Sequence, residues 1–206
     1  MTFPGRKFTS AGAYFSAYAA EVGRAAAAVD PAAVDRAAAI LRTAIAARRT
    51  IYSCGNGGSA AISNHLLCDF EKGIQTDTSF RPRVASLSAN IELITAIAND
   101  IRYEDVFVYQ LRSLAEPGDV LITISSSGDS ENVVRAVAWA RDNQVKSIAF
   151  TGFTGGRTAK LATTNIHVPA DNYGVIEDLH QSVMHILAHS LRMEGMTAER
   201  IAAVKF

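Results

Sequence analysis

The chain has 206 residues, with 20 acidic and 20 basic side chains. This length suits one α/β domain with a sizeable core and an added helical segment. The balanced charge argues against a nucleic-acid-binding surface, and no apolar run approaches the length of a membrane span. No apolar signal-peptide core follows Arg6 and Lys7, so we expect a cytoplasmic protein. From the balanced charge and the absence of a long apolar run, we expect neither a nucleic-acid nor a membrane partner.

The alanine-rich N-terminal part predicts two helices, over residues 10–29 and 31–48. An Asp-Pro dipeptide between them supplies the N-cap and the first residue of the second helix. Neither helix belongs to a β-α-β unit, so they either mediate subunit contacts or cover the sheet of their own chain. Our working division is a helical oligomerisation segment, 1–48, and a second part, 49–206, within one structural domain.

From residue 50 onward, strand-like runs alternate with helical patterns. The predicted strands span residues 50–54, 83–87, 120–124, 147–151 and 165–168, and the predicted helices span residues 59–72, 91–97, 106–115, 131–143, 157–162 and 175–194. This alternation is typical of a parallel sheet covered by helices on both faces. Such sheets bind ligands outside the carboxyl ends of their strands, so the loops after the strands are where functional residues are expected.

A glycine-rich turn over residues 55–59 follows the first strand. The helix after it would carry His65 and Asp69 four residues apart and therefore on one face. A dinucleotide-binding turn of this kind requires an acidic residue at the end of the second strand, which here ends Ala-Ser-Leu-Ser over residues 85–88. We therefore predict no nucleotide cofactor.

Serine hydroxyls crowd the loop that joins the third strand, 120–124, to the helix that begins near Glu131. The hydroxyls belong to Ser125, Ser126, Ser127 and Ser130. A helix N-terminus offers unpaired N–H groups and a partial positive charge, to which these hydroxyls add hydrogen-bond donors for an anion. One serine would suffice as an N-cap, so four of them around a glycine favour phosphate binding over a capping role.

These motifs resemble the sugar isomerase (SIS) domain and, more closely, the bacterial phosphoheptose isomerase family. The resemblance covers almost the whole chain and is carried by Gly55-Asn56-Gly57-Gly58-Ser59 with His65, Ala98-Asn99-Asp100, Ile124-Ser125-Ser126-Ser127-Gly128-Asp129-Ser130, Thr151-Gly152-Phe153-Thr154-Gly155-Gly156 and His185-Ile186-Leu187. It implies an α/β fold of the SIS type, a doubly wound, flavodoxin-like parallel sheet of about five strands with helices on both faces and an N-terminal helical extension.

The resemblance implies an aldose–ketose isomerase. Such an enzyme converts sedoheptulose 7-phosphate to D-glycero-D-manno-heptose 7-phosphate through an enediol, in the biosynthesis of nucleotide-activated heptose. Members of the family that this chain resembles are homotetramers with active sites at subunit contacts, and some of them bind zinc. We therefore expect a phosphorylated seven-carbon sugar as substrate, a homo-oligomer (a tetramer) and bound zinc.

In the family pattern the serine loop holds the phosphate. The sugar site is then lined by Asn56, Gly57, Gly58, Ser59, Asp100 and the residue at position 177. The family's acid–base pair is a glutamate and a histidine, and these positions hold Asp69 and His185 here. Asp69 is one methylene shorter than glutamate, which withdraws its carboxylate by roughly 1.5 Å, and proton transfer is sensitive to such a distance.

The second departure from the family pattern is Glu177, which stands where a glutamine is expected. The two changes either re-form the site or mark a subfamily that acts on a different sugar phosphate. We predict Asp69 or Glu177 as the base that removes the proton from carbon and His185 as the partner acid, with His65 as a ligand or an orienting group.

Zinc accepts imidazole and carboxylate ligands, so we predict a metal site made of His65, Asp69, Glu177 and His185. Glu177 and His185 are eight residues apart, or about 12 Å along a helix. They can share an ion only if Glu177 lies in an unwound helix start or if one of the two comes from another subunit. We expect His180 and His189, which belong to the same helix, to be structural.

A hypothesis from another class competes with the isomerase. SIS domains also serve as non-catalytic sugar-phosphate sensors, and a relative of the family is a tetrameric partner of a replication initiator. Such proteins keep the serine loop but need not keep the acid–base residues. The presence of His65, Asp69 and His185 favours the enzyme.

Overall fold

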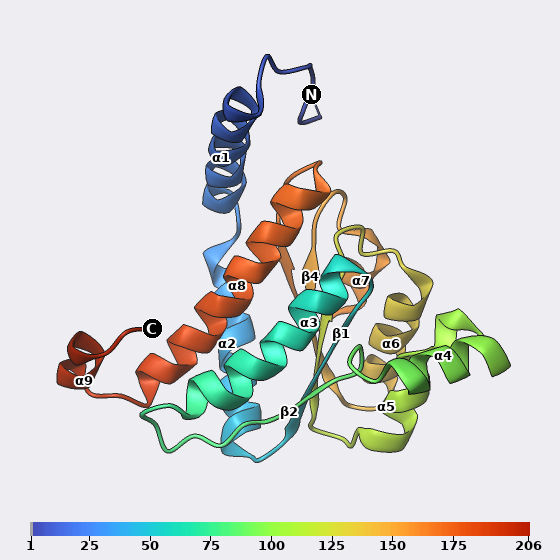
Figure 1. Cartoon of the computed structure of the whole chain (residues 1–206). Coiled ribbons are helices and arrows are strands. Elements are labelled where there is room, and N and C mark those ends of the chain that lie inside the picture. Colours follow the sequence, from blue (N-terminus) through green and yellow to red (C-terminus); the bar gives the residue numbers. More distant parts are fainter. Residues whose placement is uncertain (1) are drawn as a thin grey trace.

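A five-stranded, all-parallel sheet forms the centre of the structure, a computed structural model that describes residues 2–206 (Figure 1). Its strands are β1 (Thr50–Gly55), β2 (Arg83–Ser86), β3 (Val120–Ile124), β4 (Lys146–Thr151) and β5 (Thr164–His167). The strand order β2-β1-β3-β4-β5 is that of a doubly wound, flavodoxin-like sheet. The predicted fold class is therefore confirmed.

Helices cover both faces of this sheet. The α-helices of the described chain are α1 (Ala11–Ala27), α2 (Pro31–Ala46), α3 (Gly58–Cys68), α4 (Ile91–Asp100), α5 (Val108–Leu114), α6 (Glu131–Asp142), α7 (Gly156–Leu161), α8 (Tyr173–Glu194) and α9 (Ala198–Ala203), of which α1 and α9 lie away from the sheet. The face with α2, α3 and α8 buries Ile51, whereas the face with α4, α5 and α6 buries its neighbour Tyr52. Side chains alternate along a strand, so β1 contributes to both halves of the core.

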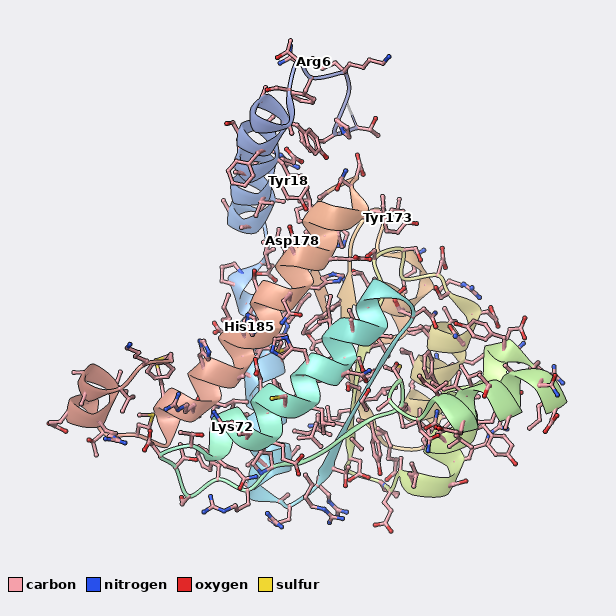
Figure 2. The ribbon with its side chains drawn as sticks, viewed as in Figure 1. Arg6, Tyr18, Lys72, Tyr173, Asp178 and His185 are labelled. Atoms are coloured by element: carbon pink, nitrogen blue, oxygen red, sulfur yellow. The ribbon has the colours of Figure 1, made fainter. Side chains whose placement is uncertain are left out.

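The two N-terminal helices occupy different environments. α2 begins with Asp30 capping the N–H of Ala32, as predicted, and packs into the main core with Ile51. α1 projects from the body and contacts mainly α8, where the Tyr18 hydroxyl donates a hydrogen bond of 2.7 Å to Asp178 (Figure 2). The structure therefore makes α2 part of the core of its own sheet, while α1 keeps an exposed surface.

The helical segment after the glycine turn differs from the prediction of one continuous α-helix. α3 ends at Cys68, and residues Asp69–Gly73 continue as a π-helix, in which the N–H of Ile74 bonds to the carbonyl of Asp69. The spacing of apolar residues does not reveal this wider turn, because both helix types keep the chain coiled in the same direction. The short α9 was also not predicted. No helix within residues 2–206 is both long enough and apolar enough to cross a membrane.

Candidate active site

The serine loop between β3 and α6 lies at the carboxyl edge of the sheet, where ligands of this fold class bind. It borders a cavity of about 180 Å³ lined by Asn56, Ser59, Ile124, Ser125, Ser126, Ser127, Ser130, Tyr173 and Glu177. The hydroxyl of Ser126 is buried and has no hydrogen-bond partner among the described residues. Ser130 occupies the N-cap position of α6, yet its side chain makes no capping bond. Neither hydroxyl is therefore held by a partner among the described residues.

The glycine of this loop, Gly128, fixes how the loop is packed. Its φ of +66° is unfavourable for other residues, and a Cβ there would lie 2.1 Å from the carbonyl oxygen of Gly155. The loop after β4 therefore packs directly against the serine loop. This contact holds the serine hydroxyls at the edge of the sheet.

Asn56 of the glycine turn, which also borders the cavity, has a fixed amide orientation. Its Oδ1 accepts hydrogen bonds from the Tyr103 hydroxyl at 2.8 Å and from Asn132 Nδ2 at 2.9 Å. Its Nδ2 donates to Asn132 Oδ1 at 2.9 Å. Since an amide nitrogen carries two hydrogens, one N–H of Asn56 remains for a ligand. The sequence reasoning missed Tyr103 and Asn132, and no short motif marks either residue.

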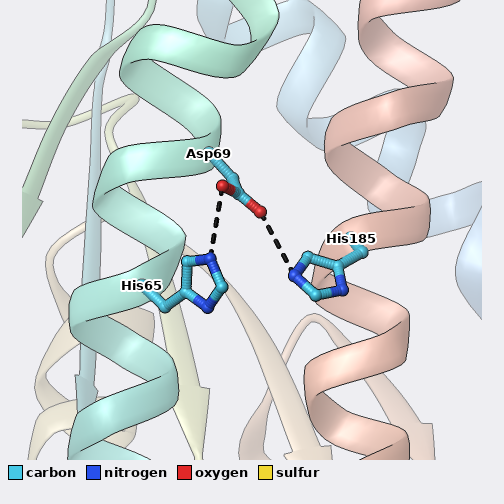
Figure 3. A group of neighbouring side chains, drawn as sticks. All are labelled: His65, Asp69 and His185. Carbon is cyan, nitrogen blue, oxygen red and sulfur yellow. Dashed lines mark ion pairs between the residues drawn. The ribbon is translucent and has the colours of Figure 1, made fainter. Parts of the chain in front are cut away.

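Three of the predicted ligands converge between α3, its π-helical extension and α8 (Figure 3). Asp69 receives one imidazole on each oxygen: His65 Nε2 lies 3.4 Å from Oδ1, and His185 Nε2 lies 3.3 Å from Oδ2. The two imidazole rings are 5.1 Å apart and nearly perpendicular. Asp69 is the first residue of the π-helix, a feature that frequently marks functional sites because it changes the direction of side chains locally.

This group has the chemistry of a metal site. One ligand atom from each of His65, Asp69 and His185 can be chosen so that all lie within 4.8 Å of one another. Two imidazoles and a carboxylate form a common ligand set of catalytic zinc, which keeps a fourth position for water or substrate. The residues present therefore fit zinc.

Glu177 does not join the group formed by His65, Asp69 and His185. It lies two helical turns earlier on α8, lines the cavity, and places its carboxylate against Gly58, where an added Cβ would be 2.6 Å from Oε2. Burial, together with the neighbouring Asp178, raises the pKa of Glu177 above its usual value. Among the described residues its carboxylate has no ion-pair partner, which leaves it available to act on a ligand.

Several proteins with similar sequences are named phosphoheptose isomerases. The SIS domain family matches residues 13–152. The phosphoheptose isomerase of Colwellia psychrerythraea is 41% identical over 140 residues, which cover 66% of this chain and 71% of that protein. The phosphoheptose isomerase of Alteromonas mediterranea is 34% identical over 164 residues, covering 78% and 82% of the two chains. The chain belongs to the SIS-domain phosphoheptose isomerase family.

Solved structures agree with this membership. The phosphoheptose isomerase of Neisseria gonorrhoeae matches with a TM-score of 0.82 and 29% identity, covering 89% of this chain and 100% of that one. The enzyme of Francisella tularensis matches with a TM-score of 0.81 and 28% identity, covering 88% and 96% of the chains.

Two other residues of this phosphoheptose isomerase family member lie away from the cavity: Asp100, which was predicted to line the sugar site, and His180, which was predicted to be structural. Asp100 is exposed at the end of α4 and accepts a hydrogen bond from Asn99. His180 is fully buried, and its Nε2 lies 3.2 Å from the carbonyl oxygen of Thr151. Burial lowers the pKa of His180 to about 4, so the ring is neutral at ordinary pH. The surroundings of His180 are those of a structural residue.

Proposed function

We propose that the chain is a phosphoheptose isomerase that converts sedoheptulose 7-phosphate to D-glycero-D-manno-heptose 7-phosphate through an enediol, in the biosynthesis of nucleotide-activated heptose. The observation that carries this proposal is the convergence of His65, Asp69 and His185 between α3 and α8, two helices that also line the serine-lined cavity, in a member of this family. A sugar-phosphate sensor would need the cavity but not the convergent acid–base group.

The serine loop binds the phosphate of the substrate. The free hydroxyls of Ser126 and Ser130 donate to its oxygens, and the N-terminus of α6 adds N–H groups and a partial positive charge. The extended substrate spans roughly 9 Å from phosphorus to C2 at ordinary bond lengths. A sugar of this length extends from the serine loop past the glycine turn and Glu177.

Glu177 removes the proton from the carbon next to the carbonyl group. Its carboxylate is unpaired, lies at the sugar turn beside Gly58, and has a raised pKa, which brings its basicity closer to the operating pH. The same carboxyl group returns the proton to the adjacent carbon, which completes the aldose–ketose exchange. Asn56 holds a hydroxyl of the sugar through its remaining amide N–H.

When no metal is bound, His185 and His65 manage the protons on the two substrate oxygens, and the Asp69 carboxylate lies between the two rings. His65, Asp69 and His185 are the residues that would hold zinc. Zinc in that position would polarise the substrate carbonyl as a Lewis acid. In this proposal Asp69 positions the imidazoles, and Glu177 transfers the proton at carbon.

The active enzyme is a homo-oligomer, which we propose to be a tetramer with sites at subunit contacts, and the N-terminal segment 1–48 mediates these contacts. The support comes from exposed apolar side chains: Phe15 on α1 is 71% exposed, and Tyr173 at the mouth of the cavity is 61% exposed. A cytoplasmic location suits a substrate whose phosphate charge prevents passage through a membrane.

Incubation of the purified protein with sedoheptulose 7-phosphate in deuterated water tests the proposal. We expect deuterium to enter C1 or C2 and an aldose phosphate to accumulate. Tight phosphate-dependent binding without exchange would instead identify a sugar-phosphate sensor. A panel of five- and six-carbon sugar phosphates, assayed in parallel, determines whether the seven-carbon substrate is preferred.

A further inference from the structure

Three side-chain contacts join α8 to α3 and its extension, and the middle contact is made by Gln181, which the sequence motifs did not include. Glu177 lies against Gly58, and His185 pairs with Asp69 farther along both helices. Between these contacts, Gln181 reaches across to His65. Residues 177, 181 and 185 are four apart, so they form one stripe on the face of α8 that packs on α3.

Gln181 contacts both histidines of the proposed metal group. Its Nε2 lies 2.9 Å from His65 Nδ1 and 2.9 Å from His185 Nε2. The amide nitrogen carries two hydrogens, and a neutral imidazole accepts through its unprotonated nitrogen. One amide group can therefore satisfy a lone pair on each ring.

The contact to His185 uses the lone pair that a metal shared with Asp69 requires. On His65, by contrast, the Gln181 amide contacts Nδ1, and the nitrogen that faces Asp69 is Nε2. His185 Nε2 faces both Asp69 Oδ2, at 3.3 Å, and the Gln181 amide, at 2.9 Å. A zinc ion coordinated by His185 Nε2 and Asp69 would occupy the side of the ring on which Gln181 donates, and an imidazole nitrogen has only one lone pair. Zinc and the Gln181 N–H thus cannot use His185 Nε2 together.

We propose that the Gln181 amide competes with the metal for the imidazole of His185. It keeps His65 and His185 in place when no metal is bound and must swing away before zinc binds, which weakens zinc affinity and makes the ion exchangeable. The proposal takes the identity of the metal group from the proposed function, but it concerns binding and not catalysis. Gln181 is thus a positioning residue.

Titration of the chelator-treated full-length protein with zinc alone, without sugar phosphate, tests the competition. We expect Gln181→Leu to bind zinc about tenfold more tightly than the wild type, because one to two hydrogen bonds no longer have to be broken. The matched control is Ser182→Ala, since that exposed hydroxyl bonds only within α8, to the carbonyl of Asp178, and should leave zinc affinity unchanged.

Weaker zinc binding by Gln181→Leu would show that Gln181 is itself a ligand and would overturn the proposal, as would equal affinity or an absence of zinc binding in both proteins. Gln181→Asn, whose shorter amide cannot span both rings, provides a polar variant in case leucine disturbs folding, and it should also bind zinc more tightly.

The side-chain amide resonances of Gln181 give a second readout, independent of any variant. In the wild-type protein we expect them to shift toward values of a solvent-exposed amide when zinc is added, and unchanged resonances at saturating zinc would refute the displacement. If the protein fails to isomerise sedoheptulose 7-phosphate, the proposed function fails while these zinc measurements still decide the role of Gln181.

Discussion

Gly58→Ala tests whether the position of the Glu177 carboxylate controls the reaction. A Cβ at residue 58 would lie 2.6 Å from Oε2, 3.1 Å from Cδ and 3.2 Å from Oε1 of Glu177, and these are its three nearest neighbours. Ordinary contact begins at 3.4 Å, so the oxygen must retreat by about 0.8 Å, the difference between 3.4 and 2.6 Å. Only the end of a flexible side chain has to move, and the fold should therefore tolerate the methyl group.

A displacement of this size should lower kcat about 100-fold, because a misplacement of about 1 Å at a reacting group can cost that factor. The assay is the initial rate of aldose formation over a range of sedoheptulose 7-phosphate concentrations, with the unfolding midpoint measured alongside. Gly23→Ala is the control, since a Cβ at residue 23 on α1 meets no atom within 4 Å. The control should keep full activity.

A double-mutant cycle sharpens the test. In a Glu177→Gln background the base is already absent, so Gly58→Ala should lower the rate little further. A Gly58→Ala enzyme with a kcat within a few-fold of the wild type would refute the reasoning. Full additivity of the two effects would also refute it, because it would mean that the methyl group acts on something other than Glu177.

Three further predictions follow from the site and the core. Glu177→Gln should reduce the rate of deuterium exchange by about 10²- to 10⁴-fold with substrate affinity retained. Asp69→Asn should mainly weaken zinc binding, as measured by zinc titration. If instead Asp69→Asn abolishes exchange and Glu177→Gln does not, Asp69 is the base. Ser126→Ala should raise KM without lowering the unfolding midpoint, because its buried hydroxyl has no partner to lose; a midpoint that falls by several degrees would contradict this. The free energy of unfolding of the wild type should fall by about 3 kcal/mol as the pH falls from 6.5 toward 4. In this range His180 takes up a proton in the unfolded chain, whereas the buried ring of the folded chain, with a pKa of about 4, stays neutral. Above pH 6.5 His180 is neutral in both states and the effect is absent. Denaturant titrations should show that His180→Gln removes this part of the pH dependence, and an unchanged slope would place the acid sensitivity elsewhere.

Local periodicity in the sequence was sufficient to predict a parallel sheet covered by helices, and the resemblance to the SIS family implied its doubly wound order. Buried strands such as 120–124 are continuous apolar runs, helices repeat their apolar residues every three to four positions, and their alternation leaves few topologies other than a parallel sheet. The same logic located the ligand-binding edge. Since parallel strands end at one edge, the glycine turn after β1 and the serine loop after β3 had to lie close together, and both line the cavity.

Side-chain partners across elements were decided only by the tertiary structure. The packing of α3 on α8 set which residues meet: it brought His65 and Asp69 to His185, left Glu177 at the cavity beside Gly58, and inserted Gln181 between the rings. Contacts between residues more than 100 positions apart depend on how two helices are placed relative to each other, and no local pattern encodes that placement.

Asp69 shows both contributions at one residue. Its sequence position, four residues after His65, was enough to place both on one face of a helix, and the structure brings the two side chains together. The π-helix that begins at Asp69 could not be predicted, because its bonds run from each N–H to the carbonyl five residues earlier and leave no trace in residue spacing. The sequence thus pointed to His65, Asp69 and His185 as candidate groups, and only the packed chain decided that Asp69 lies between two imidazoles while Glu177 remains unpaired.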